Sequence, residues 1–321
     1  MNLAARVVDG LLEAPIVPSF TRLGYSVRRA LFDWTDLDDL DGSGRTVVLT
    51  GATSGLGLAA ARRFADADTT LVIVGRNADK TERVRADLAA GGAAVSCVIA
   101  DMGDLEQVRR VSAEILEQHP RIDALVHNAG ALSAQRRDNN AGIELTVASQ
   151  VVGPFLMTHL LVPALAAATG RVITMSSGGM YSSPLRVGGL QMSDDDYGGS
   201  EQYARAKRAQ VTLNEMWPER APEPGISFHA LHPGWADTPG VEDALPTFRR
   251  IVGPALRTPD QGADTMVWLA LAPDLGDAPN GSFWLDRTPR RIHRLPSTRR
   301  SDTPERRDEL WRMVADLAGI D

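Results

Sequence analysis

Short apolar runs alternate with longer stretches of mixed polarity through most of the chain, beginning at Arg45. The apolar runs are four to seven residues long and rich in β-branched residues, which favours β-strands, and the stretches between them are predicted to be helical. The predicted strands are 45–49, 70–74, 94–100, 122–127, 171–175, 226–231 and 282–285, and the predicted helices are 58–65, 78–90, 104–118, 142–168 and 201–218. Because strands separated by helices form a parallel sheet covered on both faces, we predict a doubly wound α/β fold with ligands at the carboxyl ends of the strands.

The remaining residues form an extension before this unit and a tail after it. No internal repeat, low-complexity tract or change of composition marks a boundary, so we predict a single domain over residues 45–286, with an extension at 1–44 and a tail at 287–321. In the tail, Thr303 followed by Pro304 has the sequence of a helix start. One side of that terminal helix would hold Leu310, Trp311, Val314 and Leu317.

The extension carries apolar residues at intervals of three to four. These residues are Ile16, Phe20, Leu23, Val27, Leu31 and Trp34. Arg22, Arg28 and Arg29 fall largely outside this stripe, as in a basic amphipathic helix that lies on an anionic membrane. One hypothesis is therefore peripheral membrane contact through residues 1–40. The alternative is that the stripe packs against the protein's own body or against a second subunit, forming a homo-oligomer.

Composition excludes several classes of function. The net charge of −7 and the pI of about 5.4 argue against a nucleic-acid partner, because phosphate binding needs a basic face. The single cysteine, Cys97, rules out an internal disulfide and is expected to be buried and inert. No Cys/His cluster has the spacing of metal ligands, so no metal is expected. We find no apolar run approaching a spanning helix and no signal-peptide core, and we therefore expect a cytoplasmic protein.

The first predicted strand leads into the glycine-rich stretch 50–57, which opens the first predicted helix. Strand, glycine turn and helix in this order are typical of a dinucleotide-binding turn. Gly51 allows the tight turn, Gly55 lets a pyrophosphate approach the backbone, and Gly57 lets the helix pack on the strand. The helix N-terminus offers free N–H groups to the phosphates. The residues expected to bind there are Gly51, Thr53, Ser54, Gly55, Leu56 and Gly57.

Tyr203 and Lys207 lie four residues apart on a predicted helix and therefore share one face of it. A free tyrosine titrates near ~10 and is a poor acid at neutral pH. A cation beside the phenol favours the phenolate, so the pair is suited to exchanging a proton with a carbonyl oxygen. Tyr181 and Tyr197 have no lysine at this spacing, which singles out Tyr203.

Together with three further segments, these motifs resemble the short-chain dehydrogenase/reductase superfamily, with a Rossmann-like fold, over residues 45 to about 285. The pattern is most similar to retinol-dehydrogenase-like members and to an orphan dehydrogenase/reductase branch. The segments are His127–Gly130, Met175–Gly179 and His232–Thr238. The resemblance implies that Asp101, with Met102, contacts the adenine, that Asn128 braces the sheet, that Ala129 and Gly130 let the cofactor lie close, and that Pro233, Gly234 and Thr238 hold its nicotinamide end.

The resemblance also implies roles for the catalytic residues. Tyr203 would be the acid/base, Lys207 would lower its pKa and hold the ribose, and Ser177 would orient the substrate oxygen. Gly75 stands where an NAD enzyme of the superfamily carries a carboxylate for the ribose, and Arg76 follows it. A guanidinium suits a 2′-phosphate, so we expect NADP(H) as the cofactor. His127 is interpreted as a structural histidine.

Gln150 departs from the superfamily pattern, which usually has Asn at this position to complete the catalytic tetrad. Glutamine keeps the amide but adds a methylene, which puts the water site beside Lys207 in question. The segment from Gly178 to Gln202 is longer than in many members. Its apolar residues suit either the wall of a pocket for a lipophilic ligand or inward packing. They are Met180, Tyr181, Leu185, Val187, Leu190 and Met192.

These observations predict an NADP(H)-dependent oxidoreductase that interconverts a carbonyl and an alcohol on a small, lipophilic substrate. The alternative is a sensor or scaffold protein that binds NADPH without turnover. Gln150 favours the alternative, whereas the presence of Ser177, Tyr203 and Lys207 favours the enzyme.

Overall fold

The computed structural model describes residues 3–221, 223–244 and 246–320. The strands are β1 (Thr46–Thr50), β2 (Thr70–Gly75), β3 (Val95–Ile99), β4 (Ala124–His127), β5 (Arg171–Met175), β6 (Ser227–Leu231), β7 (Phe283–Leu285) and β8 (Thr288–Arg290). Within the described residues they form one sheet in the order β3-β2-β1-β4-β5-β6-β7-β8. Each neighbouring pair is parallel except β7 and β8. The predicted doubly wound α/β fold is confirmed, and β8 is the strand that the sequence pattern missed.

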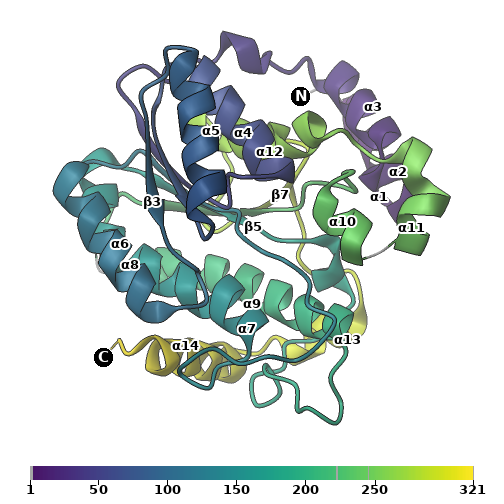
Figure 1. Cartoon of the computed structure of the whole chain (residues 1–321). Coiled ribbons are helices and arrows are strands. Elements are labelled where there is room, and N and C mark those ends of the chain that lie inside the picture. Colours follow the sequence, from purple (N-terminus) through teal and green to yellow (C-terminus); the bar gives the residue numbers. More distant parts are fainter. Residues whose placement is uncertain (1–2, 222, 245, 321) are drawn as a thin grey trace.

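Helices cover both faces of this sheet (Figure 1). One layer contains α4 (Gly55–Asp66), α5 (Ala78–Ala90) and α12 (Pro259–Leu271), and the other contains α6 (Leu105–Gln118), α8 (Gly153–Ala168), α9 (Gly199–Arg220) and α14 (Pro304–Ala318). Alternate residues of β1 enter the two cores, because Val48 packs with the second layer and Val47 and Leu49 pack with the first. The strands are therefore apolar on both sides, as in a buried parallel sheet.

Shorter elements connect these layers. They are α10 (Pro239–Ala244), α11 (Pro246–Val252), α13 (Pro296–Ser301), and the 3-10 turns η1 (Leu37–Asp39), η3 (Gly178–Tyr181) and η4 (Gly253–Ala255). The predicted terminal helix is present as α14, where the Thr303 side chain accepts a hydrogen bond from the N–H of Arg306. Leu310 and Val314 are fully buried on its inner side, and the Trp311 ring lies 4.9 Å from that of Phe155.

The long apolar helix of the second layer is interrupted near its start. It consists of α7 (Leu145–Val147), a π-helical turn η2 (Ala148–Val152) and α8. Contrary to the expectation from the sequence, this helix has the length and mean hydropathy of a spanning segment, 24 residues and 1.8. Its apolar side chains face the protein's own core, since 67% of its most apolar window is buried inside the protein. It is a core helix of this fold.

The extension folds into α1 (Leu3–Glu13), α2 (Ile16–Phe20) and α3 (Arg22–Phe32), which pack on the domain rather than presenting one amphipathic stripe. Phe20 is buried, Val27, Leu31 and Trp34 are partly buried, Leu23 is 60% exposed, and the side chain of Ile16 lies outside the described residues. Arg28, expected on the polar side, is fully buried and pairs with Asp9, Glu13 and Asp286. Most of the described stripe therefore packs against the protein's own body, and peripheral membrane contact through residues 1–40 stays a prediction.

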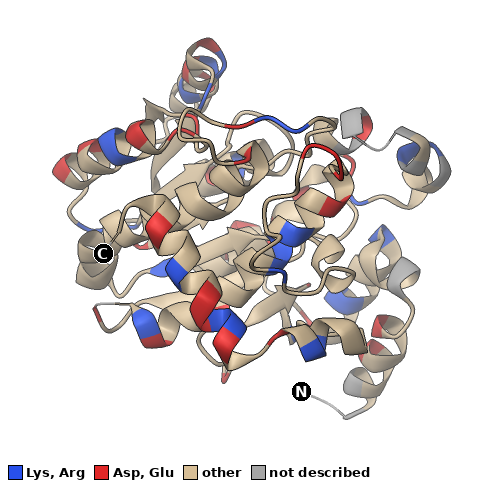
Figure 2. Ribbon diagram, turned by 90° about the horizontal axis from the view of Figure 1, so that it is seen from below, with Lys and Arg blue, Asp and Glu red and all other residues tan. Residues whose placement is uncertain are grey.

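Three other features of the surface can be compared with the sequence. Figure 2 shows Lys and Arg interspersed with Asp and Glu along the ribbon seen from below. The apolar residues of the segment Gly178–Gln202 are at most 5% exposed, so they pack inward and do not form a pocket wall. Cys97, expected to be buried, is partly exposed, because it lies on the edge strand β3 beside Glu82.

Candidate active site

The glycine turn joins the carboxyl end of β1 to α4. Gly51 has a φ of +72° and Gly55 a φ of +53°, a left-handed conformation that favours glycine. A Cβ at Gly57 would lie 2.1 Å from the carbonyl oxygen of Gly51, so the helix can approach the strand only with glycine there. Ser54 is exposed at the N-cap of α4 and its side chain caps no backbone N–H. The first N–H groups of α4 therefore remain available to a phosphate group.

Asn128 joins this turn to the end of β4. Its Nδ2 donates hydrogen bonds of 3.1 Å to the carbonyl oxygens of Thr50 and Gly51. The Thr50 Oγ1 in turn accepts hydrogen bonds of 3.0 Å from the backbone N–H groups of Asn128 and Ala129. The ends of β1 and β4 are thereby fixed side by side.

The end of β2 has no room for a side chain at Gly75. A Cβ there would lie 2.1 Å from the Oγ1 of Thr81, a fully buried residue of α5. A carboxylate of the kind that binds the ribose hydroxyls of NAD therefore cannot stand at this position. Arg76, the next residue, is exposed.

Asp101 and Met102 follow β3 in the same row of strand ends. Asp101 is partly exposed, and its Oδ1 accepts a 2.8 Å hydrogen bond from the N–H of Gly103, whereas Met102 is buried. Opposite them, Gly55 faces Thr238, with 3.3 Å between a Cβ built on Gly55 and the Thr238 Cβ. The loop before Thr238 turns at Gly234, which has a φ of +77° and lies against the guanidinium of Arg257. The segments expected to bind the cofactor thus border one region.

Ser177, Tyr203 and Lys207 meet at the carboxyl end of β5. Tyr203 and Lys207 lie on α9, with the Lys207 Nζ 5.2 Å from the centre of the Tyr203 ring. Ser177 follows β5, and its hydroxyl accepts a 3.2 Å hydrogen bond from the N–H of Gly179 and lies close enough to the Tyr203 phenol to lower the pKa of that group. The Nζ of Lys207 also donates a 2.8 Å hydrogen bond to the carbonyl oxygen of Met175. The structure therefore brings together the three side chains that the sequence singled out.

Burial controls the proton equilibria of this cluster. It raises the pKa of Tyr203 to about 12, and the hydrogen bond with Ser177 lowers it in part. Burial lowers the pKa of Lys207 to about 7. Lys207 is expected to lower the tyrosine pKa, but in the protein alone desolvation by burial is the largest influence on Tyr203 and raises it. The phenol is consequently protonated at neutral pH, as a proton donor must be.

Gln150 lies in the π-helical turn η2 and is fully buried. Its Nε2 donates a 2.7 Å hydrogen bond to the carbonyl oxygen of Ala131. Its own backbone carbonyl accepts a hydrogen bond from the Nε2 of Gln210. A Cβ on Gly130 would lie 3.0 Å from the Gln150 Oε1, so the longer amide fills the space beside Gly130. Gln210 is a residue that sequence reasoning missed, although it lies three positions after Lys207 on the same helix.

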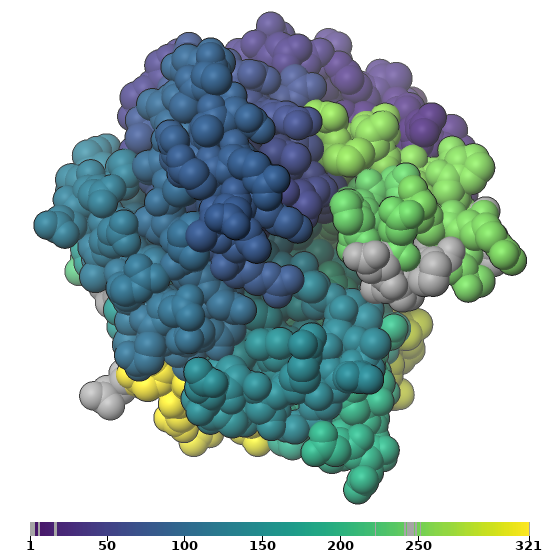
Figure 3. Space-filling model, in the orientation of Figure 1, coloured from purple at the N-terminus to yellow at the C-terminus, as the bar shows by residue number. Residues whose placement is uncertain are grey.

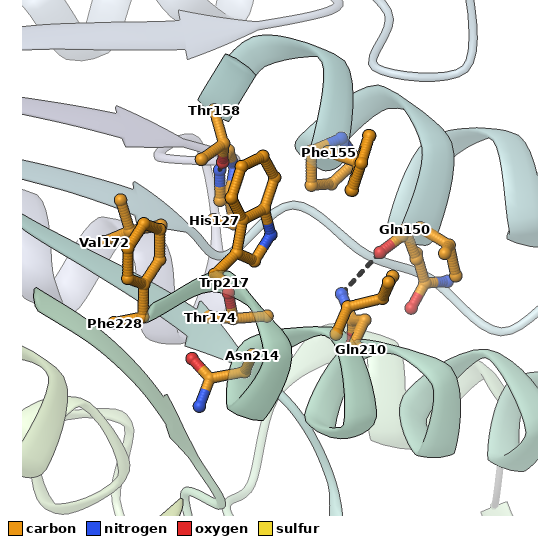
Figure 4. Close-up of a pocket in the computed structure, with 13 residues that line it drawn as sticks. His127, Gln150, Phe155, Thr158, Val172, Thr174, Gln210, Asn214, Trp217 and Phe228 are labelled. Atoms are coloured by element: carbon orange, nitrogen blue, oxygen red, sulfur yellow. Dashed lines mark hydrogen bonds between the residues drawn. The ribbon is translucent and has the colours of Figure 1, made fainter. Parts of the chain in front are cut away.

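A small cavity lies next to this glutamine pair, between α8, α9 and the sheet (Figure 4). Its volume of about 30 Å³ is sufficient for a buried water molecule. Three buried atoms in its lining residues have no hydrogen-bond partner among the described residues: Nδ1 of His127, Oε1 of Gln150 and Oε1 of Gln210. His127 is otherwise held by Thr158, at 2.8 Å from its Nε2, and burial lowers its pKa to about 3. Its neutral ring agrees with the structural interpretation.

A larger, polar cleft lies beside α10 and α11. These helices belong to the green segment in Figure 3, which borders a hollow between it and the blue part of the chain. The volume of the cleft is about 410 Å³, and Arg249 within it pairs with Asp237 and Glu242. Thr238 and the glycine turn lie next to Asp237, so this cleft adjoins the region of the strand ends.

Known proteins resemble this chain in sequence and in fold. Residues 45–247 match the family model of the short chain dehydrogenases. Human dehydrogenase/reductase SDR family member 12 is 35% identical over 302 residues, covering 93% of this chain and 94% of the relative, and human retinol dehydrogenase 13 is 26% identical over 294 residues, covering 87% and 86%. A crystal structure of a protein from Mycobacterium paratuberculosis superposes with a TM-score of 0.71 at 26% identity and covers 90% of this chain and 98% of that one. The chain belongs to the short-chain dehydrogenase/reductase family, a family of NAD(P)-dependent oxidoreductases that act on carbonyl and alcohol groups.

Proposed function

We propose that the protein is an NADP(H)-dependent oxidoreductase that interconverts a carbonyl and an alcohol on a small, lipophilic substrate. The observation that carries the proposal is the cluster of Ser177, Tyr203 and Lys207 at the end of β5, with the Lys207 Nζ 5.2 Å from the Tyr203 ring centre. A protonated phenol, a hydroxyl and an ammonium donor at one point suit a carbonyl oxygen that gains negative charge.

In the reducing direction, Tyr203 donates its proton to the carbonyl oxygen while Ser177 holds that oxygen by a hydrogen bond. A bound reduced nicotinamide would supply the hydride for the carbonyl carbon, and one hydride with one proton converts a carbonyl to an alcohol. Lys207 stabilises the phenolate that Tyr203 becomes, and it binds the cofactor ribose. The reverse sequence takes the proton back to Tyr203 and oxidises the alcohol.

The choice of NADP(H) rests on the end of β2. Thr81 fills the space in which a carboxylate at position 75 would stand, and Arg76 is exposed with its guanidinium free to meet a 2′-phosphate group. The proposal that the cofactor's pyrophosphate binds at the glycine turn has support from Gly51, Gly57 and the uncapped N-terminus of α4.

The lipophilic substrate has support from one relative, since retinol dehydrogenase 13 is named for an apolar alcohol. The segment 178–202 no longer supports it, because its apolar side chains are buried. An NADPH-binding sensor without turnover remains the second candidate. Gln150 favours this candidate. Its backbone carbonyl accepts a hydrogen bond from Gln210 and is therefore not free to hold a water molecule beside Lys207.

The deciding experiment measures NADPH oxidation by the purified protein with a panel of ketones and aldehydes. We expect turnover, and we expect Tyr203→Phe to abolish it while NADPH affinity stays nearly unchanged, because the lost proton matters only to the reaction. Lys207→Ala should reduce both the turnover and the affinity for NADPH. Tight NADPH binding without turnover of any carbonyl would identify a sensor, and undiminished turnover by Tyr203→Phe would contradict the mechanism.

A further inference from the structure

Phe20, the last residue of α2, reaches from the extension to the active-site side of the domain. It lies outside residues 45–247, which match the family model, yet it is only 2% exposed. Its ring meets the imidazole of His232 edge-on, with 4.3 Å between ring centres, and lies 5.8 Å from the ring of Trp235. Both partners belong to the loop that follows β6.

His232 connects Phe20 to the turn that carries Ser177. The N–H of Gly178 donates a 3.2 Å hydrogen bond to the Nδ1 of His232. A Cβ on Gly178 would lie 2.9 Å from the His232 Nε2 and 3.0 Å from the Phe20 ring, so the three groups are packed without spare space. Burial lowers the pKa of His232 to about 3, which keeps the imidazole neutral and its Nδ1 an acceptor.

The backbone around Phe20 holds the second loop of the site. The N–H of Trp235 donates a 2.7 Å hydrogen bond to the carbonyl oxygen of Phe20. Arg257 lies between the two segments, because it donates to the carbonyl oxygens of Ser19 and Thr21 on one side and of Pro233 on the other. The loop around Gly234 is thus attached to the extension through both a backbone bond and a buried guanidinium.

We propose that Phe20 is a positioning residue of the active site. It fixes the Ser177 turn through His232, and it fixes the loop 233–235 through its backbone carbonyl and its contact with Trp235. The proposal rests on the proposed function, in which Ser177 binds the substrate oxygen and this loop holds the nicotinamide end of the cofactor. A displacement of about 1 Å in such a group can cost a factor of ~10² in rate, so a small loosening here would be measurable.

A role limited to core packing makes a different prediction. Phe20 belongs to a small apolar cluster with Met180, Tyr181 and Phe283. If it only contributed buried area there, its removal would lower the stability of the whole domain and increase exchange throughout the sheet. A positioning role instead confines the change to the two loops that Phe20 holds.

The test compares Phe20→Ala with Phe20→Leu and with Leu23→Ala, a control at a 60% exposed position of α3. Hydrogen exchange is measured in the full-length protein on peptides covering residues 176–182 and 233–238, with 46–50 and 70–75 as references. We expect Phe20→Ala to accelerate exchange about tenfold in the two loop peptides and to leave the reference strands unchanged. Phe20→Leu should recover most of the protection, and Leu23→Ala should match the original protein.

With a substrate in hand, Phe20→Ala should lower kcat about tenfold at saturating NADPH and well below its Tm, with a smaller change in KM. Equal acceleration in the loops and in the strands, or no acceleration in either, would overturn the proposal. If the original protein turns over no carbonyl, the proposed function fails, and the exchange data still decide whether Phe20 positions these loops.

Discussion

Lys207 shows at the scale of one residue how the fold sets a chemical property. The side chain is 2% exposed, and its Nζ has a protein partner in the carbonyl oxygen of Met175. A carbonyl oxygen compensates only part of the lost hydration, so burial lowers the lysine pKa from 10.5 to about 7. Near neutral pH the group is therefore divided between its charged and neutral forms.

This lowered pKa predicts how stability depends on pH. Between pH 7 and 10.5 the unfolded chain carries a proton on Lys207 that the folded chain has lost, so the free energy of unfolding rises with pH there. Below pH 7 Lys207 is charged in the folded protein as well, so the desolvation of this charge lowers the free energy of unfolding by its full amount. We expect Lys207→Met to raise the Tm, and to raise it more at pH 6 than at pH 9. Calorimetry at both pH values measures this, with the exposed Lys80→Met as control. An equal gain at both values would contradict the lowered pKa.

Arg76 predicts the cofactor preference. If its guanidinium meets a 2′-phosphate, NADPH should bind at least about tenfold more tightly than NADH, a difference of about 1.4 kcal/mol. Arg76→Ala should remove most of that difference and leave NADH affinity nearly unchanged. Fluorescence titration with both cofactors tests it, and Arg83→Ala, exposed on the neighbouring α5, is the control. Equal affinities of the original protein for the two cofactors would refute the assignment.

Site residues that depend on neighbours in sequence could be predicted, and those that depend on distant neighbours could not. Gly51 and Gly57 are required by a turn of a few residues, and Tyr203 and Lys207 share a helix face, so each signal is local. Gly130 is different, because the space beside it is limited by Gln150 from another element. Such a contact cannot be read from the sequence, because the sequence does not show which residues of two distant segments lie next to each other.

At the scale of elements, the long helix illustrates the same limit. Its apolar composition predicted a helix from 142 to 168, and a helix is present from Leu145. The π-helical turn at Ala148–Val152 has no local sequence signal, and the partner of its Gln150 carbonyl is the Gln210 amide on the distant helix α9. Such turns often occur at functional sites.

The position of Gln150 in this turn predicts the effect of restoring asparagine. Asparagine is shorter by a methylene, so Gln150→Asn would withdraw the amide from the Ala131 carbonyl oxygen and leave additional space beside the existing cavity. The lost hydrogen bond costs about 1 kcal/mol and the missing methylene about a further 0.8 kcal/mol. Chemical denaturation should show this loss, whereas Gln135→Asn at an exposed position should show none. An unchanged stability would mean that the turn adapts to either amide.

Helix α1 is the part of the extension that retains an apolar exposed surface. Val7, Val8 and Leu11 are 55%, 42% and 71% exposed. If the protein contacts membranes peripherally, this surface is expected to carry the contact, because the apolar side chains of α2 and α3 are largely used in packing. Anionic vesicles should then sediment the protein, and the double variant Val7→Ser/Leu11→Ser should remain in the supernatant. Loss of sedimentation with Leu23→Ser instead would assign the contact to α3.

At the scale of the whole molecule, a buried ionic cluster ties the N-terminal extension to the domain. Asp286, in the tight turn between β7 and β8, bonds Arg28 of the extension and Arg257 before α12. Arg28 continues to Asp9 and Glu13 on α1, and all three central residues are at most 1% exposed. The sequence showed three unremarkable charges here, because partners so far apart in the chain meet only when the sheet has formed.

This cluster predicts a large effect of one small substitution. Asp286→Asn keeps the shape of the side chain but leaves the buried Arg257 without its carboxylate, whereas Arg28 keeps Asp9 and Glu13. Breaking one side of a buried ion pair typically costs about 3–5 kcal/mol. The arginines hold the pKa of Asp286 below its usual value despite burial, so its contribution is present at neutral pH and is lost as the pH falls below 3.8.

The control for Asp286 is Asp36→Asn, which breaks the exposed pair with Arg29 and should cost less than about 1 kcal/mol. Denaturant unfolding at pH 7 measures both variants against the original protein. We expect the difference between Asp286→Asn and the original protein to shrink towards acid pH, because the original then protonates the same carboxylate. If both variants lost the same small amount, the extension would be attached by apolar contacts such as Phe20 and Tyr25, and the charges would serve only to fix its orientation.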